Sequence, residues 1–168
     1  MTTVYTASYD SPLGVIHLAG DKRGLVGLWF KGQKYDQNLP PGFSLVVNDQ
    51  LDVFRQANRW LDIYFSGREP DFTPALSMIG TDFQRKVWRA LLDIPYGQLA
   101  SYREIACRVG NPGALRATAH AISRNRISII IPCHRVISSN YKLTGYAGGI
   151  ERKRALLRLE HSLDLIDD

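Results

Sequence analysis

Residues 131–136 read Ile131-Pro132-Cys133-His134-Arg135-Val136 and continue an apolar run that begins at Ile127. The pattern predicts a short buried strand over residues 127–131, which delivers a cysteine fixed by a proline and followed by an imidazole. A cysteine reacts as its thiolate, and a paired base or nearby positive charge makes the thiolate available near neutral pH. The alternative is that Cys133 is one more small buried apolar residue, because free cysteines are among the most buried residues. The rest of the chain decides between these two interpretations.

Length and composition are those of an ordinary globular protein. The chain has 168 residues, of which 45% are hydrophobic and 22% are charged, so it can form one compact unit or two small ones. No apolar stretch approaches the roughly 20 residues needed to span a bilayer, and no signal peptide is visible. Two cysteines, Cys107 and Cys133, make neither a disulfide framework nor a zinc site. We therefore expect a cytoplasmic protein with no membrane partner, no metal and no cofactor.

The charge is unevenly distributed along the chain. Residues 1–80 contain 7 Lys and Arg against 8 Asp and Glu, whereas residues 81–168 contain 14 against 8. A basic half in an otherwise neutral protein indicates a polyanionic partner such as nucleic acid, whose affinity depends largely on phosphate neutralisation. The alternative is a solvated basic surface without a partner.

The first half is predicted to be a small sheet followed by a helix. Three β-prone runs, Val4–Tyr9, Val15–Ala19 and Leu25–Phe30, are separated by turn-forming residues, which predicts an antiparallel meander. Asn48 or Asp49 is expected to cap a helix whose apolar stripe runs from Val53 to Phe65 and which Gly67 ends.

The domain organisation follows from a Gly- and Pro-containing stretch, residues 66–80, which is predicted to be a linker. We expect an α/β protein in two parts. Residues 1–76 form an antiparallel β-meander plus a helix. Residues 81–168 form a mainly helical domain with a helix-turn-helix and the short strand that carries Cys133.

The second half begins with a series of short helices. Thr81-Asp82-Phe83-Gln84 is a capping box that opens a helix through Leu92, and Ser101-Tyr102-Arg103-Glu104 opens another that ends at Gly110. Asn111-Pro112-Gly113 then turns into a helix over residues 114–124. Two short helices joined by a glycine-containing turn are typical of a helix-turn-helix.

The second helix of this pair combines small and basic residues. Small residues allow close approach to a partner backbone, and cations contact phosphates. The alternative is an Ala-rich surface helix. The residues concerned are Ala114, Ala117 and Ala121, together with Arg116, His120 and Arg124.

Two features after Cys133 complete a candidate site. The segment 143–149 is rich in glycine, which lets the backbone approach a flat ligand that Tyr146 could cover. A last helix, from Ile150 to Leu163, is apolar on one face apart from Glu160. A buried carboxylate needs a partner, and with His134 it makes a relay in which the imidazole takes the thiol proton directly or through water. The alternative for Glu160 is a solvated helix position.

These motifs resemble those of the O6-alkylguanine-DNA alkyltransferases, the methylated-DNA–protein-cysteine methyltransferases. The resemblance runs from about Thr81 to His161, whereas the first half is similar only in its layout. Residues 1–80 contain no cysteine, so the zinc site of some members is not expected. The matching blocks are residues 83–88, 94–97, 101–102, 110–112, 116–117, Asn125, 132–136 and 144–149.

The resemblance implies a reaction. Cys133 is the nucleophile that attacks the alkyl carbon of an O6-alkylguanine in duplex DNA, which leaves a thioether and restored guanine. His134 is a water-bridged base with Glu160 behind it, and Asn125 braces the turn before the active-site segment. Tyr102 rotates the target phosphate and donates a proton to the purine. The thioether has no electrophilic carbonyl that water could attack, so the free cysteine is not regenerated. Each molecule of the enzyme therefore acts for a single turnover.

The resemblance also implies how DNA is bound. The target nucleotide flips out through the minor groove, because its O6 substituent is otherwise out of reach, and Arg116 fills the space it leaves. We expect a monomer, and leave open cooperative binding and action on O4-alkylthymine. Further DNA contacts are expected from Tyr102, Arg103, Asn111, Ala117, His120, Arg124, Arg135 and Ser139, and the base pocket from Val136, Tyr146, Ala147 and Gly148.

Some positions depart from the family pattern. His120 stands where relatives have a small residue, and Tyr141 where they often have glycine, so Asn140 is expected to take any positive φ. Cys107 is expected to be a packed helix residue.

A non-catalytic alkyltransferase-like damage binder is one alternative function, although such relatives lack the cysteine. A thiol hydrolase on a helix-turn-helix scaffold is another, and its mark is multiple turnover on an ester.

Overall fold

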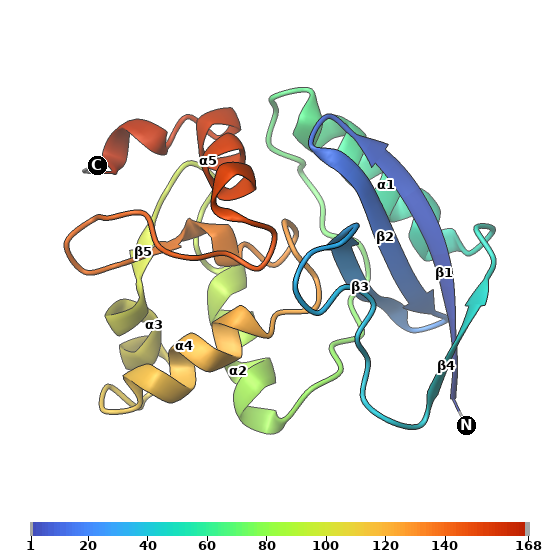
Figure 1. Ribbon diagram of the computed structural model, residues 1–168, viewed down its shortest axis with the longest axis horizontal. Coiled ribbons are helices and arrows are strands. Elements are labelled where there is room, and N and C mark those ends of the chain that lie inside the picture. The colour runs from blue at the N-terminus through green and yellow to red at the C-terminus, as the bar shows by residue number, and fades with distance from the viewer. Residues whose placement is uncertain (1, 167–168) are drawn as a thin grey trace. The chain divides into compact units, whose positions relative to one another are not determined.

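The computed structural model describes residues 2–166, which divide into two compact units with their boundary between Ile79 and Gly80 (Figure 1). The first unit contains a four-stranded sheet and one long helix, and the second contains four α-helices and a small two-stranded pair. The α/β fold class expected from the sequence is confirmed. In residues 2–166 no helix combines the length and apolar character that a bilayer crossing requires.

The sheet of the first unit has the strand order β3-β2-β1-β4. Strands β1 (Thr2–Ser11), β2 (Gly14–Asp21) and β3 (Gly24–Phe30) form the predicted antiparallel meander. Strand β4 (Phe43–Val47) pairs parallel to β1 and was not predicted. Its last three residues are exposed, so it lacks the alternation of buried and exposed side chains that marks a strand in a sequence.

Helix α1 (Asp52–Phe65) lies along one face of this sheet (Figure 1). It begins two or three residues later than predicted, with Leu51 as its N-cap in place of Asn48 or Asp49. The Asn48 side chain instead accepts a hydrogen bond from the Gln50 backbone N–H. Its end before Gly67 is as predicted, since that glycine takes a φ of 88°. Its buried face consists of Val53, Phe54, Ala57, Trp60, Leu61 and Tyr64.

The segment after α1 is not a free linker throughout. The backbone N–H of Leu25 donates to Ala75 O at 2.8 Å, and the N–H of Ser77 donates to Leu25 O at 2.8 Å. Residues 75–77 thus add to the outer edge of β3, which explains why the first unit extends beyond residue 76.

The second unit is built on helices α2 (Asp82–Leu92), α3 (Tyr102–Arg108), α4 (Leu115–Ser123) and α5 (Ile150–Leu159). Both predicted capping boxes are confirmed, at the starts of α2 and α3. Helices α2, α3 and α4 contact one another, and the buried Trp88 indole donates to Ala121 O at 2.9 Å. Helix α4, the second helix of the helix-turn-helix, is therefore fixed to α2 by a buried hydrogen bond.

The short strand predicted over residues 127–131 is wrong. Its backbone bonds locally, since Ile130 N–H donates to Ser128 O at 2.8 Å and Ile131 N–H to Ile127 O at 3.1 Å. Ile129 takes a φ of 69°, a conformation rare for a β-branched residue. Cys133 then lies in a 3-10 turn, η1 (Cys133–Arg135). An apolar run buried on all sides has the same sequence pattern whether it is extended or coiled.

The residues after η1 form one strand of a short parallel pair. Strand β5 (Ala100–Ser101) pairs in parallel with β6 (Val136–Ile137), which joins the start of α3 to the end of η1. The last helix ends earlier than predicted, at Leu159. Glu160 is its C-cap, and a 3-10 turn, η2 (Leu163–Leu165), follows.

Candidate active site

The Cys133 side chain is almost completely buried at the start of η1, where its Sγ accepts a hydrogen bond from Asn125 Nδ2 at 3.2 Å. Burial raises the pKa of this thiol, and neither that hydrogen bond nor the positive charge of Lys153 offsets it. Nearby positive charge alone therefore does not supply a thiolate. Cys133 is protonated at neutral pH and needs a base in order to react.

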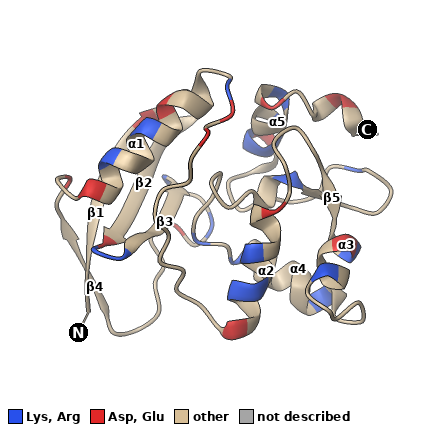
Figure 2. Cartoon of the chain, turned by 180° about the vertical axis from the view of Figure 1, so that it is seen from behind, with Lys and Arg blue, Asp and Glu red and all other residues tan. Residues whose placement is uncertain are grey.

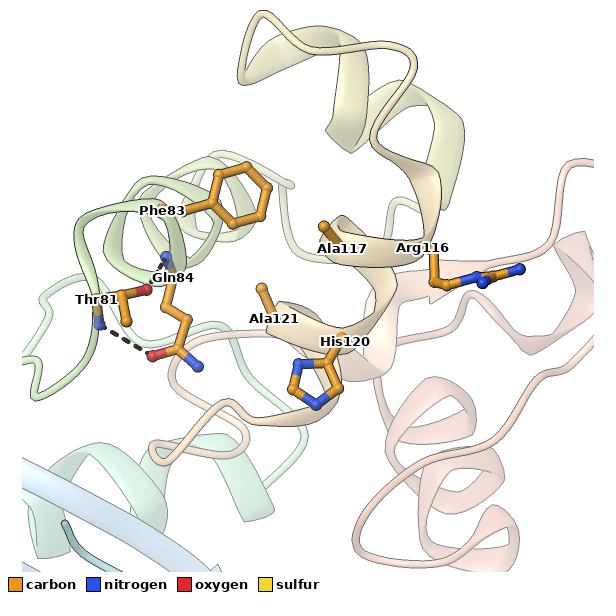
Figure 3. Close-up of a pocket in the computed structure, with 7 residues that line it drawn as sticks. All are labelled: Thr81, Phe83, Gln84, Arg116, Ala117, His120 and Ala121. Carbon is orange, nitrogen blue, oxygen red and sulfur yellow. Dashed lines mark hydrogen bonds between the residues drawn. The ribbon is translucent and has the colours of Figure 1, made fainter.

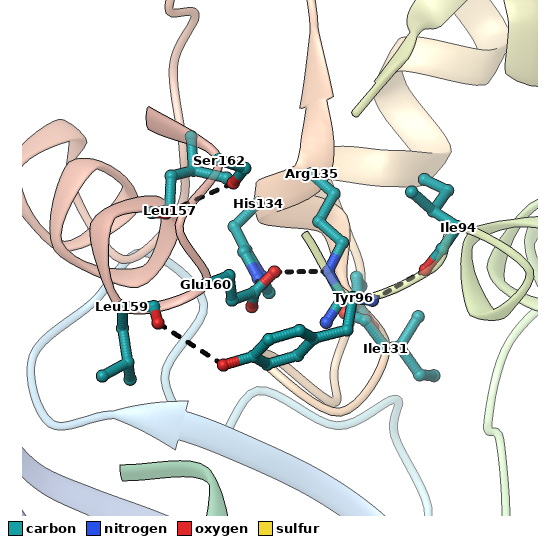
Figure 4. Close-up of polar contacts among 10 residues, drawn as sticks. Ile94, Tyr96, Ile131, His134, Arg135, Leu157, Leu159, Glu160 and Ser162 are labelled. Carbon is teal, nitrogen blue, oxygen red and sulfur yellow. Dashed lines mark hydrogen bonds and ion pairs between the residues drawn. The ribbon is translucent and has the colours of Figure 1, made fainter. Parts of the chain in front are cut away.

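His134 has the properties of that base. Its Nε2–H donates to Glu160 Oε2 at 2.6 Å, with both side chains fully buried (Figure 4). Burial lowers the pKa of His134 despite the opposing effect of Glu160, so the imidazole is neutral. A neutral ring that donates from Nε2 leaves Nδ1 unprotonated. This Nδ1 is buried and has no hydrogen-bond partner among the described residues, so it can accept a proton.

Glu160 is held as a carboxylate by two neighbours. Burial acts to raise the pKa of its carboxyl, but the interactions with His134 and Arg135 outweigh burial and hold it well below the usual range. Its second oxygen, Oε1, accepts from Arg135 Nε at 2.7 Å (Figure 4). The carboxylate therefore fixes the imidazole tautomer, which is the geometry that the sequence predicted for this pair.

Arg135 serves this carboxylate, and its predicted contact with DNA does not fit the structure. Its side chain is buried, its Nη1 donates to Ile94 O at 2.7 Å, and its guanidinium lies 5.7 Å from the centre of the Tyr96 ring. Tyr96 in turn donates from its hydroxyl to Leu159 O at 3.4 Å. An arginine with these partners joins the segment after α2 to the C-cap of α5, and its guanidinium is directed into the protein.

Asn125 organises the coiled segment before Cys133. Its Nδ2 lies 2.9 Å from Ile131 O and 3.3 Å from Ile127 O, and its Oδ1 accepts from the Ile127 N–H at 3.0 Å. The Asn125 side chain thus supplies backbone hydrogen bonds that a neighbouring strand would otherwise make with this segment. Because the same Nδ2 reaches Cys133 Sγ, Asn125 also sets the position of the sulfur.

Lys153 is a site residue that the sequence analysis missed. It is fully buried, and its Nζ donates to Val136 O at 2.7 Å and to Thr144 Oγ1 at 3.0 Å. Burial lowers its pKa to about 8, against the effect of Cys133, so the amine is mostly charged at neutral pH. Lys153 precedes Leu156, Leu157 and Glu160 by three, four and seven residues, so the helical periodicity that singled out Glu160 could have found it.

Two of the residues predicted to line the base pocket, Val136 and Tyr146, contact Lys153 and His134 of this site. Val136 and Gly148 are buried, and Tyr146 and Ala147 are partly exposed. The Tyr146 ring meets the His134 ring edge to face, with the ring centres 6.4 Å apart. The Tyr102 hydroxyl lies 3.0 Å from Thr144 Oγ1.

The exposed face of α4 carries the predicted DNA contacts. Arg116, Ala117 and His120 are exposed, and Arg124 is partly exposed. A hollow next to this face is lined by residues of α2 and α4, and Phe83 points across it toward Ala117, while Arg116 points outward (Figure 3). Lys and Arg also recur on α2 and α5 (Figure 2). The complete lining of the hollow is Thr81, Phe83, Gln84, Arg116, Ala117, His120 and Ala121.

Of the other predicted contacts, Arg103 lies in α3, and Asn111 and Ser139 lie on connections. Two smaller expectations are wrong. Arg103, Asn111 and Ser139 are all exposed. Cys107 is exposed on α3, where it was expected to be packed. Tyr141, and not Asn140, takes the positive φ of its turn, at 61°.

Comparison with known proteins assigns the chain to a family. Residues 82–162 match the family described as 6-O-methylguanine DNA methyltransferase, DNA binding domain, and residues 4–78 match the ribonuclease-like domain of the same proteins. A methylated-DNA–protein-cysteine methyltransferase of Methanosarcina acetivorans is 48% identical over 159 residues, which cover 95% of this chain and 99% of the relative. The chain belongs to the methylated-DNA–protein-cysteine methyltransferases.

Solved structures of related methyltransferases agree with the fold. The crystal structure of the O6-methylguanine methyltransferase of Mycobacterium tuberculosis is 45% identical with a TM-score of 0.78, covering 95% of this chain and 93% of that one. The OGT of the same organism in complex with DNA is 45% identical with a TM-score of 0.82, covering 95% and 94%. The resemblance found in the sequence is confirmed, and it extends to the first half. This methyltransferase is a DNA-repair enzyme that transfers a methyl group from methylated DNA to a cysteine.

Proposed function

We propose that this methyltransferase removes the alkyl group of O6-alkylguanine in duplex DNA and keeps it on Cys133. The observation that carries the assignment is a buried cysteine, Cys133, followed in the chain by His134, whose Nδ1 has no hydrogen-bond partner among the described residues and whose Nε2–H is held by Glu160. Cys107, the other cysteine, is exposed on α3. The carboxylate of Glu160, which orients the base, is paired with His134 and Arg135, which follow Cys133 in the chain. The acceptor is therefore Cys133.

The reaction is an in-line displacement at the alkyl carbon. His134 takes the thiol proton through a water molecule, and the sulfur forms its bond to carbon as the bond from carbon to O6 breaks. The electron pair of the broken bond goes to the purine, which Tyr102 protonates to give guanine. Asn125 keeps the sulfur in place while its charge changes. The proton held by His134 returns to Tyr102 through solvent.

The product explains why the protein acts once. A thioether has no electrophilic carbonyl for water to attack, and a thiolate is a poor leaving group from a methyl carbon. Neither His134 nor Tyr102 offers a route back to the free thiol. One molecule is therefore consumed for each lesion repaired.

The exposed face of α4 supports the proposed mode of DNA binding. Small Ala117 allows close approach to the minor groove, while Arg116 points away from the helix and can enter the base stack (Figure 3). In this proposal Arg103, Asn111, His120, Arg124 and Ser139 contact the DNA backbone. An extruded base would lie against Val136, Tyr146, Ala147 and Gly148.

Intact mass spectrometry tests the function. After incubation with a duplex containing O6-methylguanine, the protein should gain one methyl group, and peptide mapping should place it on Cys133. A non-catalytic damage binder would bind the duplex with no change in mass. A thiol hydrolase would turn over an ester repeatedly, with no lasting gain.

Arg116→Ala should weaken repair of duplex DNA by about tenfold or more, because the space left by the extruded nucleotide is no longer filled and re-stacking competes with capture. Reaction with the free base O6-benzylguanine, which needs no extrusion, should change by less than about twofold, since Arg116 lies outside the chemical centre. The measurement is the rate of Cys133 alkylation on each substrate.

Arg55→Ala is the charge-matched control for this comparison, since Arg55 is exposed on α1 in the first unit. It should repair duplex DNA at the wild-type rate. Equal loss for Arg116→Ala on the duplex and the free base would remove the assignment of Arg116 as the intercalating residue.

We further propose a cytoplasmic location and action as a monomer. Cys133 must stay reduced to accept an alkyl group, which favours a reducing compartment. All the chemical groups of the proposed mechanism belong to one chain and one unit, Gly80–Asp168.

A further inference from the structure

Thr144 links two groups of the active site that do not touch each other directly. Its Oγ1 lies 3.0 Å from the Tyr102 hydroxyl and 3.0 Å from Lys153 Nζ. Lys153 Nζ also donates to Val136 O at 2.7 Å. The result is a continuous row of hydrogen bonds from the fully buried amine of Lys153 to the phenol proposed to protonate the purine.

The direction of these hydrogen bonds follows from which groups can donate. A charged lysine amine only donates, so Thr144 Oγ1 accepts from Lys153. The hydroxyl hydrogen of Thr144 is then free to be donated to the Tyr102 oxygen. With that oxygen accepting from Thr144, the hydrogen of Tyr102 is available for an acceptor in the base pocket.

We propose that Thr144 is a positioning residue for the proton donor: it turns the Tyr102 hydrogen toward the bound purine and stabilises the phenolate left when that proton is given up. The proposal rests on the proposed function, since it assigns Thr144 a part in the same reaction. The proton passes from Tyr102 to the purine as the bond to O6 breaks, and Thr144 keeps its own hydrogen throughout.

The electrostatics of the site agree with this role. Burial raises the pKa of Tyr102, and the hydrogen bond to Thr144 acts in the opposite direction. Lys153 strengthens the hydrogen bond from Thr144 to Tyr102, because a hydroxyl that accepts a hydrogen bond from a charged amine is a better donor. Thr144 therefore favours loss of the proton from a phenol that burial would otherwise make a weak acid.

The test compares Thr144→Val, which keeps the shape of the side chain but removes the hydroxyl, with Thr144→Ser, which keeps the hydroxyl. We expect Thr144→Val to transfer methyl from an O6-methylguanine duplex about tenfold more slowly at saturating DNA, while its affinity for an unmodified duplex is unchanged. Thr144→Ser should recover to within about twofold of wild type. Thr73→Val, at an exposed position in the first unit, is the matched control and should not change the rate.

A second substrate separates proton donation from packing. On a duplex whose lesion is the 8-aza analogue of O6-methylguanine, the departing purine is a weaker base and needs less help from an acid. The deficit of Thr144→Val should then shrink to about twofold. An equal deficit on both lesions, a wild-type rate for Thr144→Val, or a loss in Thr144→Ser as large as in Thr144→Val would overturn the proposal.

These outcomes differ from failure of the proposed function. If wild type takes up no methyl group, the alkyl transfer itself is wrong. If wild type is methylated on Cys133 and Thr144→Val keeps pace with it, only the role of Thr144 is wrong.

Discussion

Cys133→Ser should take up no methyl group from an O6-methylguanine duplex under conditions in which wild type is fully methylated. A serine hydroxyl is a far weaker nucleophile than a thiolate, and His134 can relieve only part of that difference. We expect a rate below about one-thousandth of wild type. Intact mass measured over time gives the rate directly.

The same variant should still fold and bind DNA, since serine is smaller than cysteine and its hydroxyl can accept the hydrogen bond from Asn125. Its free energy of unfolding should lie within about 1 kcal/mol of wild type. Cys107→Ser is the matched control and should be methylated at the wild-type rate, because Cys107 is exposed on α3. Methylation of Cys133→Ser at a rate near wild type would show that another residue accepts the alkyl group.

Glu160→Gln should impair both the chemistry and the fold. The amide cannot balance the positive charge of Arg135, and its NH₂ group faces a second donor at Arg135 Nε or His134 Nε2. We expect the methylation rate to fall about a hundredfold or more, because the imidazole is no longer held in one tautomer. The free energy of unfolding should fall by about 3 kcal/mol, the usual cost of removing one partner of a buried ion pair.

The loss of stability should depend on pH in a defined direction. The pKa of Glu160 is lower in the folded protein than in the unfolded chain, so its contribution is fully present above an unfolded pKa of about 4.3 and is lost progressively as pH falls from there through the lower folded pKa. Urea unfolding at pH 7 should therefore separate Glu160→Gln from wild type by the full difference, and this difference should become smaller near pH 3. Glu151→Gln, at an exposed position in the first turn of α5, should match wild type at both pH values. A gap that persists unchanged at pH 3 would mean that Glu160 is not ionised in the folded protein.

Local signals in the sequence predicted much of this structure. The capping boxes at Thr81 and Ser101 were correct, because both partners of each box lie within one turn and depend on nothing distant. The pairing of Glu160 with His134 was also correct, since a carboxylate on an apolar helix face has few ways to be satisfied. Strand β4 depends on a distant partner, β1, and the coiled segment 127–131 depends on hydrogen bonds to the Asn125 side chain. The hydrophobic pattern of the sequence reveals neither.

Charged residues were the hardest to place. Arg135 was expected to contact DNA from the family resemblance, but it points inward to Glu160 and Ile94. Lys153 was overlooked because a lysine among arginines and leucines looks like a solvated position, although it is fully buried. Whether a basic side chain is buried or exposed depends on packing and on buried hydrogen-bond acceptors. The composition of the sequence shows neither.

The inward position of Arg135 bears on how inherited variation in this gene would be interpreted. Changes at Arg135, Glu160 or Asn125 should lower the amount of protein in a cell together with its repair capacity, so survival after alkylating drugs and protein abundance would fall in step. Changes at Arg116 should leave abundance untouched while survival drops. A survey that scores both traits would thus sort the residues of this site into those that hold it together and those that meet the lesion.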